Sequence, residues 1–270
     1  MLRSLIRSPL GAIARAGTGE AVGYPYVNSE ARALVVAMSV KPNDTRKALI
    51  DALITGLKAD GLWTILDALY LLAAHDAQAG KLNWKAPGTY TLAESGTGTW
   101  TTDRDWAGNG VDGRLTTGAA PASLTNFLQD NASAFVWSRT AAASAANALG
   151  LAANANVQLN PRSTVGDVFA HRINDITGAN IANASGLGFY VSCRTGATAT
   201  QGYKNGAAFG SAGAATTTAR SANNIVLGGH QATYATTAIA AAGLGAGMDA
   251  TQNANLYARL NTFMSAIGAA

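Results

Sequence analysis

The densest group of polar side chains lies in the stretch TTDRDWAGNGVDG, residues 101–113. Carboxylate and amide oxygens are the ligands that Ca²⁺ takes, six to eight at a time. The stretch offers four such side chains, Asp103, Asp105, Asn109 and Asp112, but their spacing does not match an EF-hand loop. The alternative is local, with Arg104 paired to a neighbouring Asp and Asn109-Gly110 forming a turn. Calcium stays a candidate ligand of Asp103, Asp105 and Asp112, and no other cofactor is expected.

Aromatic residues beside turns rich in Gly and Asn indicate a second kind of chemistry, sugar binding. Sugars stack their apolar faces on exposed aromatic rings, while amide and carboxylate groups bond to the hydroxyls. Trp106 and Tyr203 each precede such a turn, so both rings are expected at the surface. The candidate glycan-binding residues are Trp106, Asn109, Asp112, Tyr203 and Asn205.

Hydrolytic chemistry has few candidate groups. Glycosidases normally use two carboxylates, yet the last glutamate is Glu94, and the acids after Asp112 are Asp130, Asp167, Asp175 and Asp249. The histidines His75, His171 and His230 have no His or Cys partner at zinc-ligand spacing. No G-x-S-x-G nucleophile elbow is present. We expect no enzyme, with polysaccharide degradation through Asp167 and Asp175 as an alternative.

Composition narrows the possible partners. Only 13% of the 270 residues are charged, about half the usual share. The net charge of +4 is mild and forms no basic stripe of the kind that nucleic acids need. The single cysteine, Cys193, predicts no internal disulfide. No apolar run approaches the roughly 20 residues that span a bilayer, so neither nucleic acid nor a membrane span is expected.

Two kinds of elements must position these residues. Apolar residues at three- and four-residue steps predict helices over 28–40, 43–60 and 62–77. Beyond residue 90, short alternating runs predict strands over 132–140, 166–173, 187–195 and 223–229. Strands at this density indicate a mainly β fold, an antiparallel sandwich or jelly roll.

Local signals add detail to this outline. Asn205-Gly206 fits the two-residue hairpin turn in which both residues have positive φ. Asn43-Asp44 is expected to cap the helix over 43–60, and Asp249 to cap a final helix that ends near Gly268. The Ala-rich stretch 140–157 is compatible with helix, strand or loop.

The N-terminal segment MLRSLIRSPLGAIARAG carries Arg3, Arg7 and Arg15 and no acid. We interpret it as a basic arm that anchors the chain to a partner protein; the alternatives are a tail packed on its own domain and a targeting peptide. The expected organisation is an arm over 1–23, a helical module over 24–90 and a jelly roll over 91–270 that ends in a helix.

The order of the segments resembles a known group of proteins. KALIDALITGLKADGLWTILDALYLLAAHDAQAGKLNW is followed by TTDRDWAGNGVDGRLTTG, GFYVSCRTG, GYKNG, NNIVLGG and finally LYARLNTFMSAIG. This succession, over about residues 24–268, resembles tailed-phage and prophage virion proteins with a concanavalin A-like, LamG-type jelly roll. Such proteins are typical of alphaproteobacterial phages and gene-transfer-like particles.

The resemblance implies a concanavalin A-like sandwich and a structural role on the virion surface, as a fibre, spike or decoration protein. It also implies three kinds of partner: other virion proteins bound through the arm, further copies of the chain in a homo-oligomer, and host-surface polysaccharide. Two alternatives stay open, a decoration or connector protein without ligand and a free secreted lectin.

Overall fold

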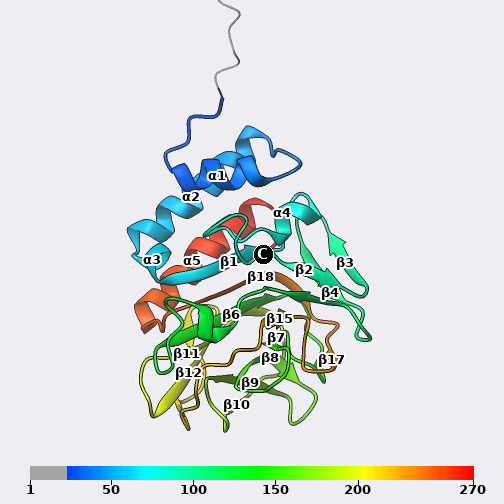
Figure 1. Cartoon of the computed structure of the whole chain (residues 1–270), viewed down its shortest axis with the longest axis vertical. Helices are drawn as coiled ribbons and strands as arrows, with labels where there is room; N and C mark the ends of the chain where they lie inside the picture. The colour runs from blue at the N-terminus through cyan, green and yellow to red at the C-terminus, as the bar shows by residue number, and fades with distance from the viewer. Residues whose placement is uncertain (1–22) are drawn as a thin grey trace, which may run out of the picture.

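The computed structural model describes residues 23–270, which form three layers (Figure 1). Helices cover one face of a nine-stranded sheet, and a seven-stranded sheet packs on its other face. One hydrophobic core lies between the helices and the first sheet, and another lies between the two sheets. The fold is therefore a mainly β antiparallel sandwich with N-terminal helices and a C-terminal helix, as the sequence predicts.

Nine strands form the sheet beneath the helices. They are β1 (Leu66–Leu71), β3 (Gly98–Thr101), β4 (Asp105–Gly108), β6 (Ala132–Ser138), β11 (Gly188–Arg194), β12 (Ala199–Lys204), β13 (Ala207–Ala208), β14 (Gly213–Ala214) and β18 (Ala238–Gly245). Their order is β13-β12-β11-β6-β18-β4-β3, with β1 also paired to β18 and β14 to β12. All of these pairs are antiparallel.

The second sheet has the order β10-β9-β8-β7-β15-β5-β2. Its strands are β2 (Ala93–Ser95), β5 (Arg114–Thr116), β7 (Leu149–Leu151), β8 (Val157–Ser163), β9 (Val168–Ile173), β10 (Ala179–Ala182) and β15 (Ile225–Leu227). A separate short pair joins β16 (Gly229–His230) to β17 (Thr233–Tyr234). The strands predicted near 132, 166, 187 and 223 are confirmed, and the Ala-rich stretch 140–157 contributes β7.

The helices are α1 (Ser29–Ala37), α2 (Asp44–Ala59), α3 (Leu62–Ile65), α4 (Ala77–Lys81) and α5 (Ala250–Ala266), with a 3₁₀ turn at Pro121–Ser123. Asn43 caps α2 by accepting a hydrogen bond from the Arg46 N–H, and Asp249 forms a capping box with Gln252 at the start of α5. Both caps confirm the sequence prediction. Within residues 23–270, no helix combines the length and the apolar character needed to cross a bilayer.

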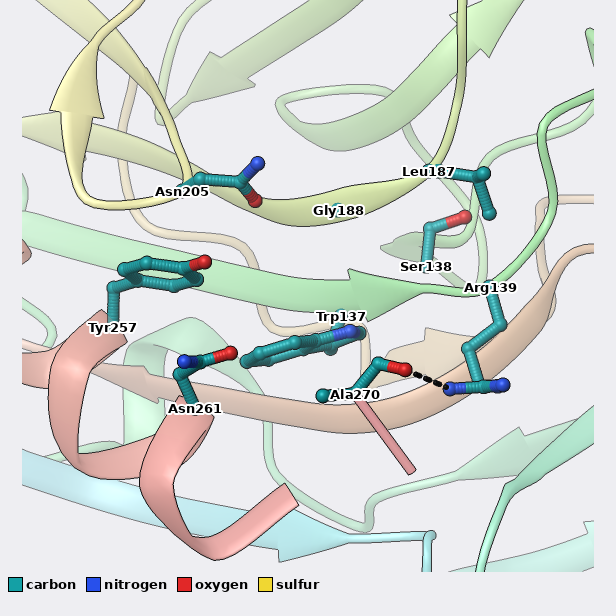
Figure 2. Close-up of a pocket in the computed structure, with 9 residues that line it drawn as sticks. All are labelled: Trp137, Ser138, Arg139, Leu187, Gly188, Asn205, Tyr257, Asn261 and Ala270. Carbon is teal, nitrogen blue, oxygen red and sulfur yellow. Dashed lines mark hydrogen bonds between the residues drawn. The ribbon is translucent and has the colours of Figure 1, made fainter. Parts of the chain in front are cut away.

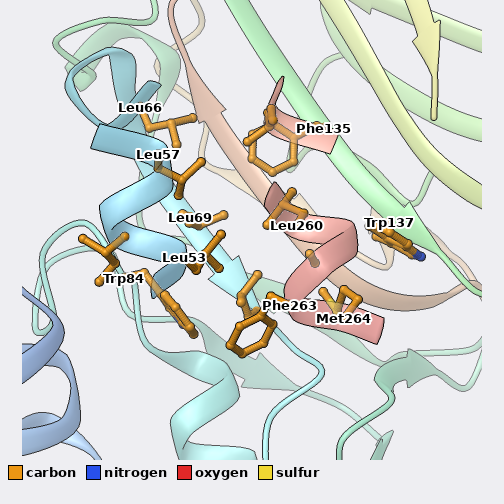
Figure 3. Packing of buried hydrophobic residues seen from close by; sticks show 14 of the residues in the cluster. Leu53, Leu57, Leu66, Leu69, Trp84, Phe135, Trp137, Leu260, Phe263 and Met264 are labelled. Carbon is orange, nitrogen blue, oxygen red and sulfur yellow. The ribbon is translucent and has the colours of Figure 1, made fainter. Parts of the chain in front are cut away.

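The helices bury apolar side chains against the first sheet (Figure 3). Leu53 and Leu57 of α2 and Leu260 and Phe263 of α5 meet side chains from the strands, among them Phe135 of β6. Alternate residues of β6 serve the two cores, because successive strand side chains point to opposite faces. Phe135 and Trp137 face the helices, whereas Ala134 and Val136 face the second sheet.

The helix predicted over 62–77 is wrong. One helical turn, α3, is followed by β1, which pairs with β18 from Leu66↔Gly245 to Leu71↔Ala241. Leu69 and Leu71 face the helices while Ala68 and Tyr70 face the second sheet. A strand buried on both faces is an almost continuous apolar run, which periodicity alone does not distinguish from a helix. Residues 24–90 are therefore not a purely helical module, since they contribute a strand to the sandwich.

The hairpin predicted at Asn205-Gly206 is confirmed. Lys204 pairs with Ala207, and φ is +50° at Asn205 and +81° at Gly206. Both central residues therefore adopt the left-handed conformation that a tight two-residue turn requires. Gly206 has a second reason to be glycine, because a Cβ there would lie 3.0 Å from the Cβ of Tyr257 on α5. The hairpin tip thus rests directly on the C-terminal helix.

Candidate functional site

Trp106 is not the exposed aromatic ring that the sequence predicts. It is 0% exposed and lies in the core between the two sheets. Its indole Nε1 donates to Glu94 at 2.8 Å, and Glu94 also accepts from Trp100 at 3.1 Å. The Gly-rich segments beside Trp106 let the backbone pack closely over the ring, so they mark burial and not exposure.

Asn109 and Asp112 are exposed, but they are engaged with each other. Asn109 Oδ1 accepts from the backbone N–H groups of Val111, Asp112 and Gly113, and its Nδ2 donates to Asp112 Oδ1 at 2.7 Å. Asp112 Oδ1 also accepts from the Thr97 N–H at 3.0 Å. The Thr97 N–H and the Asn109 amide lower the pKa of Asp112. These bonds close a turn, as the local alternative predicts.

The three calcium candidates do not converge. Asp103 pairs with Arg46 of α2 at 2.6 Å, and Asp105 lies 3.3 Å from Nε of Arg139. Burial raises the pKa of Asp105, although Arg139 acts in the opposite direction. The pairing expected for Arg104 is wrong, since cations from distant segments take both carboxylates. No group of three metal-ligating side chains occurs in the described part of the chain.

The predicted glycan-binding residues do not form one site either. Tyr203 is only 7% exposed and packs in the core beneath the helices, whereas Asn205 is exposed. In the sheet, β12 and β4 are separated by β11, β6 and β18. Four strand spacings correspond to roughly 19 Å. Asn205 therefore lies far from the turn that holds Asn109 and Asp112. The anchor candidates Arg3, Arg7 and Arg15 lie outside the described residues.

A cleft of about 340 Å³ does include Asn205 (Figure 2). It opens where the end of β6, the start of β11 and the β12–β13 hairpin meet α5 and the last residues of the chain. Its lining residues are Trp137, Ser138, Arg139, Leu187, Gly188, Asn205, Tyr257, Asn261 and Ala270. Arg139 is the one charged side chain among them, and none of the nine carries a carboxylate side chain.

Two stacked aromatic rings form one wall of this cleft. The ring centroids of Trp137 and Tyr257 lie 5.7 Å apart, and the ring planes are inclined by 24°. Phe189 supports both rings from the core, at 5.8 Å from Trp137 and 6.1 Å from Tyr257. Trp137 is 6% exposed, and Figure 2 shows its indole nitrogen on the edge that faces Arg139 and Ala270. The wall is a rigid apolar surface with polar atoms at its rim.

Asn205 is held in place on the opposite side of the cleft. Its Oδ1 accepts from the Phe189 N–H at 2.8 Å, and its own N–H donates to the Phe189 carbonyl at 2.8 Å. Gly188 makes room for this arrangement, since a Cβ there would lie 2.7 Å from Oδ1. With Oδ1 engaged, the Nδ2 group of Asn205 is the part of the amide that remains for a ligand.

Arg139 and Asn261 complete the polar rim. Besides its contact with Asp105, Arg139 donates to the carbonyl oxygen of Ala269 and, at 3.4 Å, to that of Ala270. Asn261 lies one helical turn after Tyr257 on α5, so both side chains face the cleft. The sequence interpretation missed Trp137, Arg139, Tyr257 and Asn261. The Tyr257/Asn261 spacing on a predicted helix was the one local signal for this site.

Comparisons with known proteins show the fold. No protein-family model and no curated protein matches the chain. Among solved structures, the chain is similar to Trypanosoma rangeli sialidase in complex with 2,3-difluoro-KDN, with a TM-score of 0.51 and 10% identity. That match covers 80% of this chain but 40% of the sialidase chain, so this chain spans about two fifths of that protein.

Two further solved structures are more weakly similar. Domain 4 of AbnA, an extracellular arabinanase from Geobacillus stearothermophilus in complex with arabinotriose, has a TM-score of 0.48 and 13% identity over 72% of this chain and 98% of that one. The receptor binding domain of botulinum neurotoxin C/D mosaic serotype has a TM-score of 0.49 and 9% identity, over 73% and 51%. At these identities a structural likeness shows only a shared fold.

Proposed function

We propose that the protein binds a glycan in the cleft between β6, β11, the Asn205 hairpin and α5. The observation that carries this proposal is the pairing of the stacked Trp137–Tyr257 wall with the fixed amide of Asn205. A pyranose ring presents an apolar face to such a wall and hydroxyl groups to amides at the rim. A cleft of about 340 Å³ accommodates one or two sugar rings.

We propose binding without cleavage. Glycoside hydrolysis normally uses a pair of carboxyl groups on either side of the bond that breaks. The described lining of the cleft offers amide, phenol, indole and guanidinium groups and no carboxylate side chain. The acids that the sequence analysis named for catalysis are engaged elsewhere: Asp167 pairs with Arg162, and Asp175 accepts from the N–H groups of Thr177, Gly178 and Thr216.

We place this binding activity on the surface of a tailed-phage or phage-like particle, where the ligand is a host-surface polysaccharide. The support is the succession of sequence segments, which resembles virion proteins, together with a composition poor in charged residues. Many copies on one particle raise the avidity of weak single-site sugar contacts. A homo-oligomeric fibre, spike or decoration protein is the form in which such a chain reaches its host.

The test is a glycan array probed with the full chain, followed by calorimetry on the best ligand. Tyr257→Ala removes half of the aromatic wall and is expected to weaken binding about tenfold, or about 1.4 kcal/mol. Tyr234→Ala is the matched control, because Tyr234 is a partly exposed aromatic residue outside the cleft. The proposal is wrong if no glycan binds, or if Tyr257→Ala and Tyr234→Ala bind the ligand as the unmodified chain does.

A further inference from the structure

A second cleft, of about 490 Å³, lies on the helical layer, where the chain enters α1 and α2. Its lining includes Tyr24, Tyr26, Arg32, Lys41 and Lys47, and no acidic residue lines it. Figure 1 shows α1 at the outer end of the molecule, beyond α2 and far from the seven-stranded sheet. This basic cleft is distinct from the glycan cleft in place and in charge.

The positive charge of the basic cleft is only partly balanced. Arg32 forms no salt bridge within residues 23–270. The ammonium group of Lys41 donates to the carbonyls of Val36 and Met38 at the end of α1, which orders the side chain without cancelling its charge. Lys47 alone has a carboxylate partner, Asp44 at 2.7 Å. Uncompensated charge of one sign attracts a partner of the opposite sign.

Exposed apolar side chains accompany this charge. Val27 is 81% exposed, Val36 is 66% exposed and Val40 is 53% exposed. Single exposed apolar residues are ordinary, but these three fall within residues 27–40, the same segment that supplies Arg32 and Val35 to the cleft. Val36 lies one helical turn after Arg32 on α1 and Val40 directly precedes Lys41, whereas Val27 lines a neighbouring cleft with Asp51. Apolar residues such as Val36 and Val40 beside a charged cleft are typical of a protein-binding surface.

We propose that the basic cleft, with Val36 and Val40 next to it in the chain, binds an acidic segment of a partner protein, in which Asp or Glu alternates with apolar residues. Charge complementarity selects this occupant over the chain's own first residues. Residues 1–22 contain Arg3, Arg7 and Arg15 against the single acid Glu20, so they have the same sign as the cleft. The valines favour a peptide over a nucleic acid, whose phosphates offer them no apolar contact.

The probe is a short fluorescent peptide of Glu and Leu, with an analogue in which Gln replaces every Glu. Anisotropy titrations with the full chain are expected to show binding of the Glu peptide that weakens as salt rises. The double variant Arg32→Gln/Lys47→Gln is expected to bind it about tenfold more weakly, and Val36→Ser to bind it several-fold more weakly. Arg104→Gln, an exposed control in the turn before β4 that removes one positive charge outside the cleft, is expected to bind as the unmodified chain does.

Three outcomes would overturn the proposal. The first is equal binding of the Glu and Gln peptides, or no binding of either at low salt. The second is a double variant that retains full affinity, or loses no more than Arg104→Gln does, while thermal unfolding shows that all variants are folded. The third is a single-stranded oligonucleotide that binds more tightly than the Glu peptide and competes with it, which would assign the cleft to nucleic acid.

Discussion

The amide oxygen of Asn205 and the backbone N–H of Phe189 lie 2.8 Å apart, which ties the tip of the β12–β13 hairpin to β11. Because Asn205 has φ of +50°, replacing it separates two roles. Asn205→Gly keeps the left-handed turn and removes the amide, so glycan affinity is expected to fall several-fold with a stability loss near 1 kcal/mol. Asn205→Ala adds backbone strain and is expected to cost about 2 kcal/mol or more.

Chemical denaturation and calorimetry on both Asn205 variants check this prediction. A Gly variant that binds glycan as tightly as the unmodified chain would remove Asn205 from the binding site. An Ala variant as stable as the Gly variant would contradict the left-handed turn.

A substitution of Trp106 is expected to change stability but not glycan binding. Trp106→Phe leaves the partly buried Glu94 carboxylate without one of its hydrogen-bond donors and removes ring volume from the core, so a loss of about 2 kcal/mol is expected. Glycan affinity should not change, because Trp106 faces the space between the sheets. Denaturant unfolding measures the loss of stability, and calorimetry measures the glycan affinity. A stable variant with weakened glycan binding would restore Trp106 as a ligand-contacting residue.

His171 predicts how stability depends on pH. It is 1% exposed, its Nδ1 lies 2.9 Å from Ser192 Oγ, and its Nε2 has no partner in the described residues. Burial lowers its pKa from 6.5 to about 4, while the charge of Asp175 acts weakly in the opposite direction. The unfolded chain therefore binds the proton first, so stability is lost as the pH falls from about 6.5 to about 4.

The loss from His171 is expected to reach about 3 kcal/mol. Urea unfolding measured across this pH range tests it, with His171→Gln as the control. The variant should be less stable near neutral pH but should show a flatter pH dependence. Carboxylates with lowered pKa, such as Asp175, act below this range. An unmodified chain with constant stability between the two pH values would contradict the burial of a neutral imidazole.

Strand β1 can be tested by hydrogen exchange. In β1, Ala68 and Tyr70 alternate with Leu69, whose N–H donates to Asn83 Oδ1 on the outer edge, so the amides of Ala68 and Tyr70 face β18 within a sheet covered on both faces. They are expected to exchange as slowly as those of β18, with protection near the global unfolding free energy. The amides of α1, at the edge of the molecule, are expected to exchange much faster. Equal, fast exchange in β1 and α1 would contradict the pairing of β1 with β18.

Predictions from the sequence are most accurate where interactions between neighbouring residues determine the structure. Asn205-Gly206, Asn43 and Asp249 each satisfy neighbouring backbone groups, and all three were predicted correctly. Predictions from the sequence are less accurate where packing against distant segments determines the structure. The apolar run of β1 fits a helical periodicity as well as a strand. Only the tertiary structure, which covers both faces of β1, distinguishes the two. Trp106 and its Gly-rich neighbours fit an exposed turn as well as a buried ring under close-packed backbone.

The candidate site could not be predicted from local sequence patterns for a similar reason. Trp137, Asn205 and Tyr257 come from a central strand, an edge hairpin and the last helix. Only the pairing of β6 with β11 and the seat of the hairpin on α5 bring them together. The carboxylates of Asp103 and Asp105 illustrate the same point, since their cations come from α2 and from the end of β6.

The pairing of β1 with β18 connects the N-terminal helices directly to the C-terminal helix through the sheet. The helices that carry the basic cleft lead through α3 into β1, β1 is bonded to β18, and β18 runs on into α5, which carries Tyr257. A tether at the N-terminal end and a load on the cleft would therefore pull on the same strand pair. Tension between the two clefts is borne by the β1–β18 ladder of the nine-stranded sheet and not by a flexible linker.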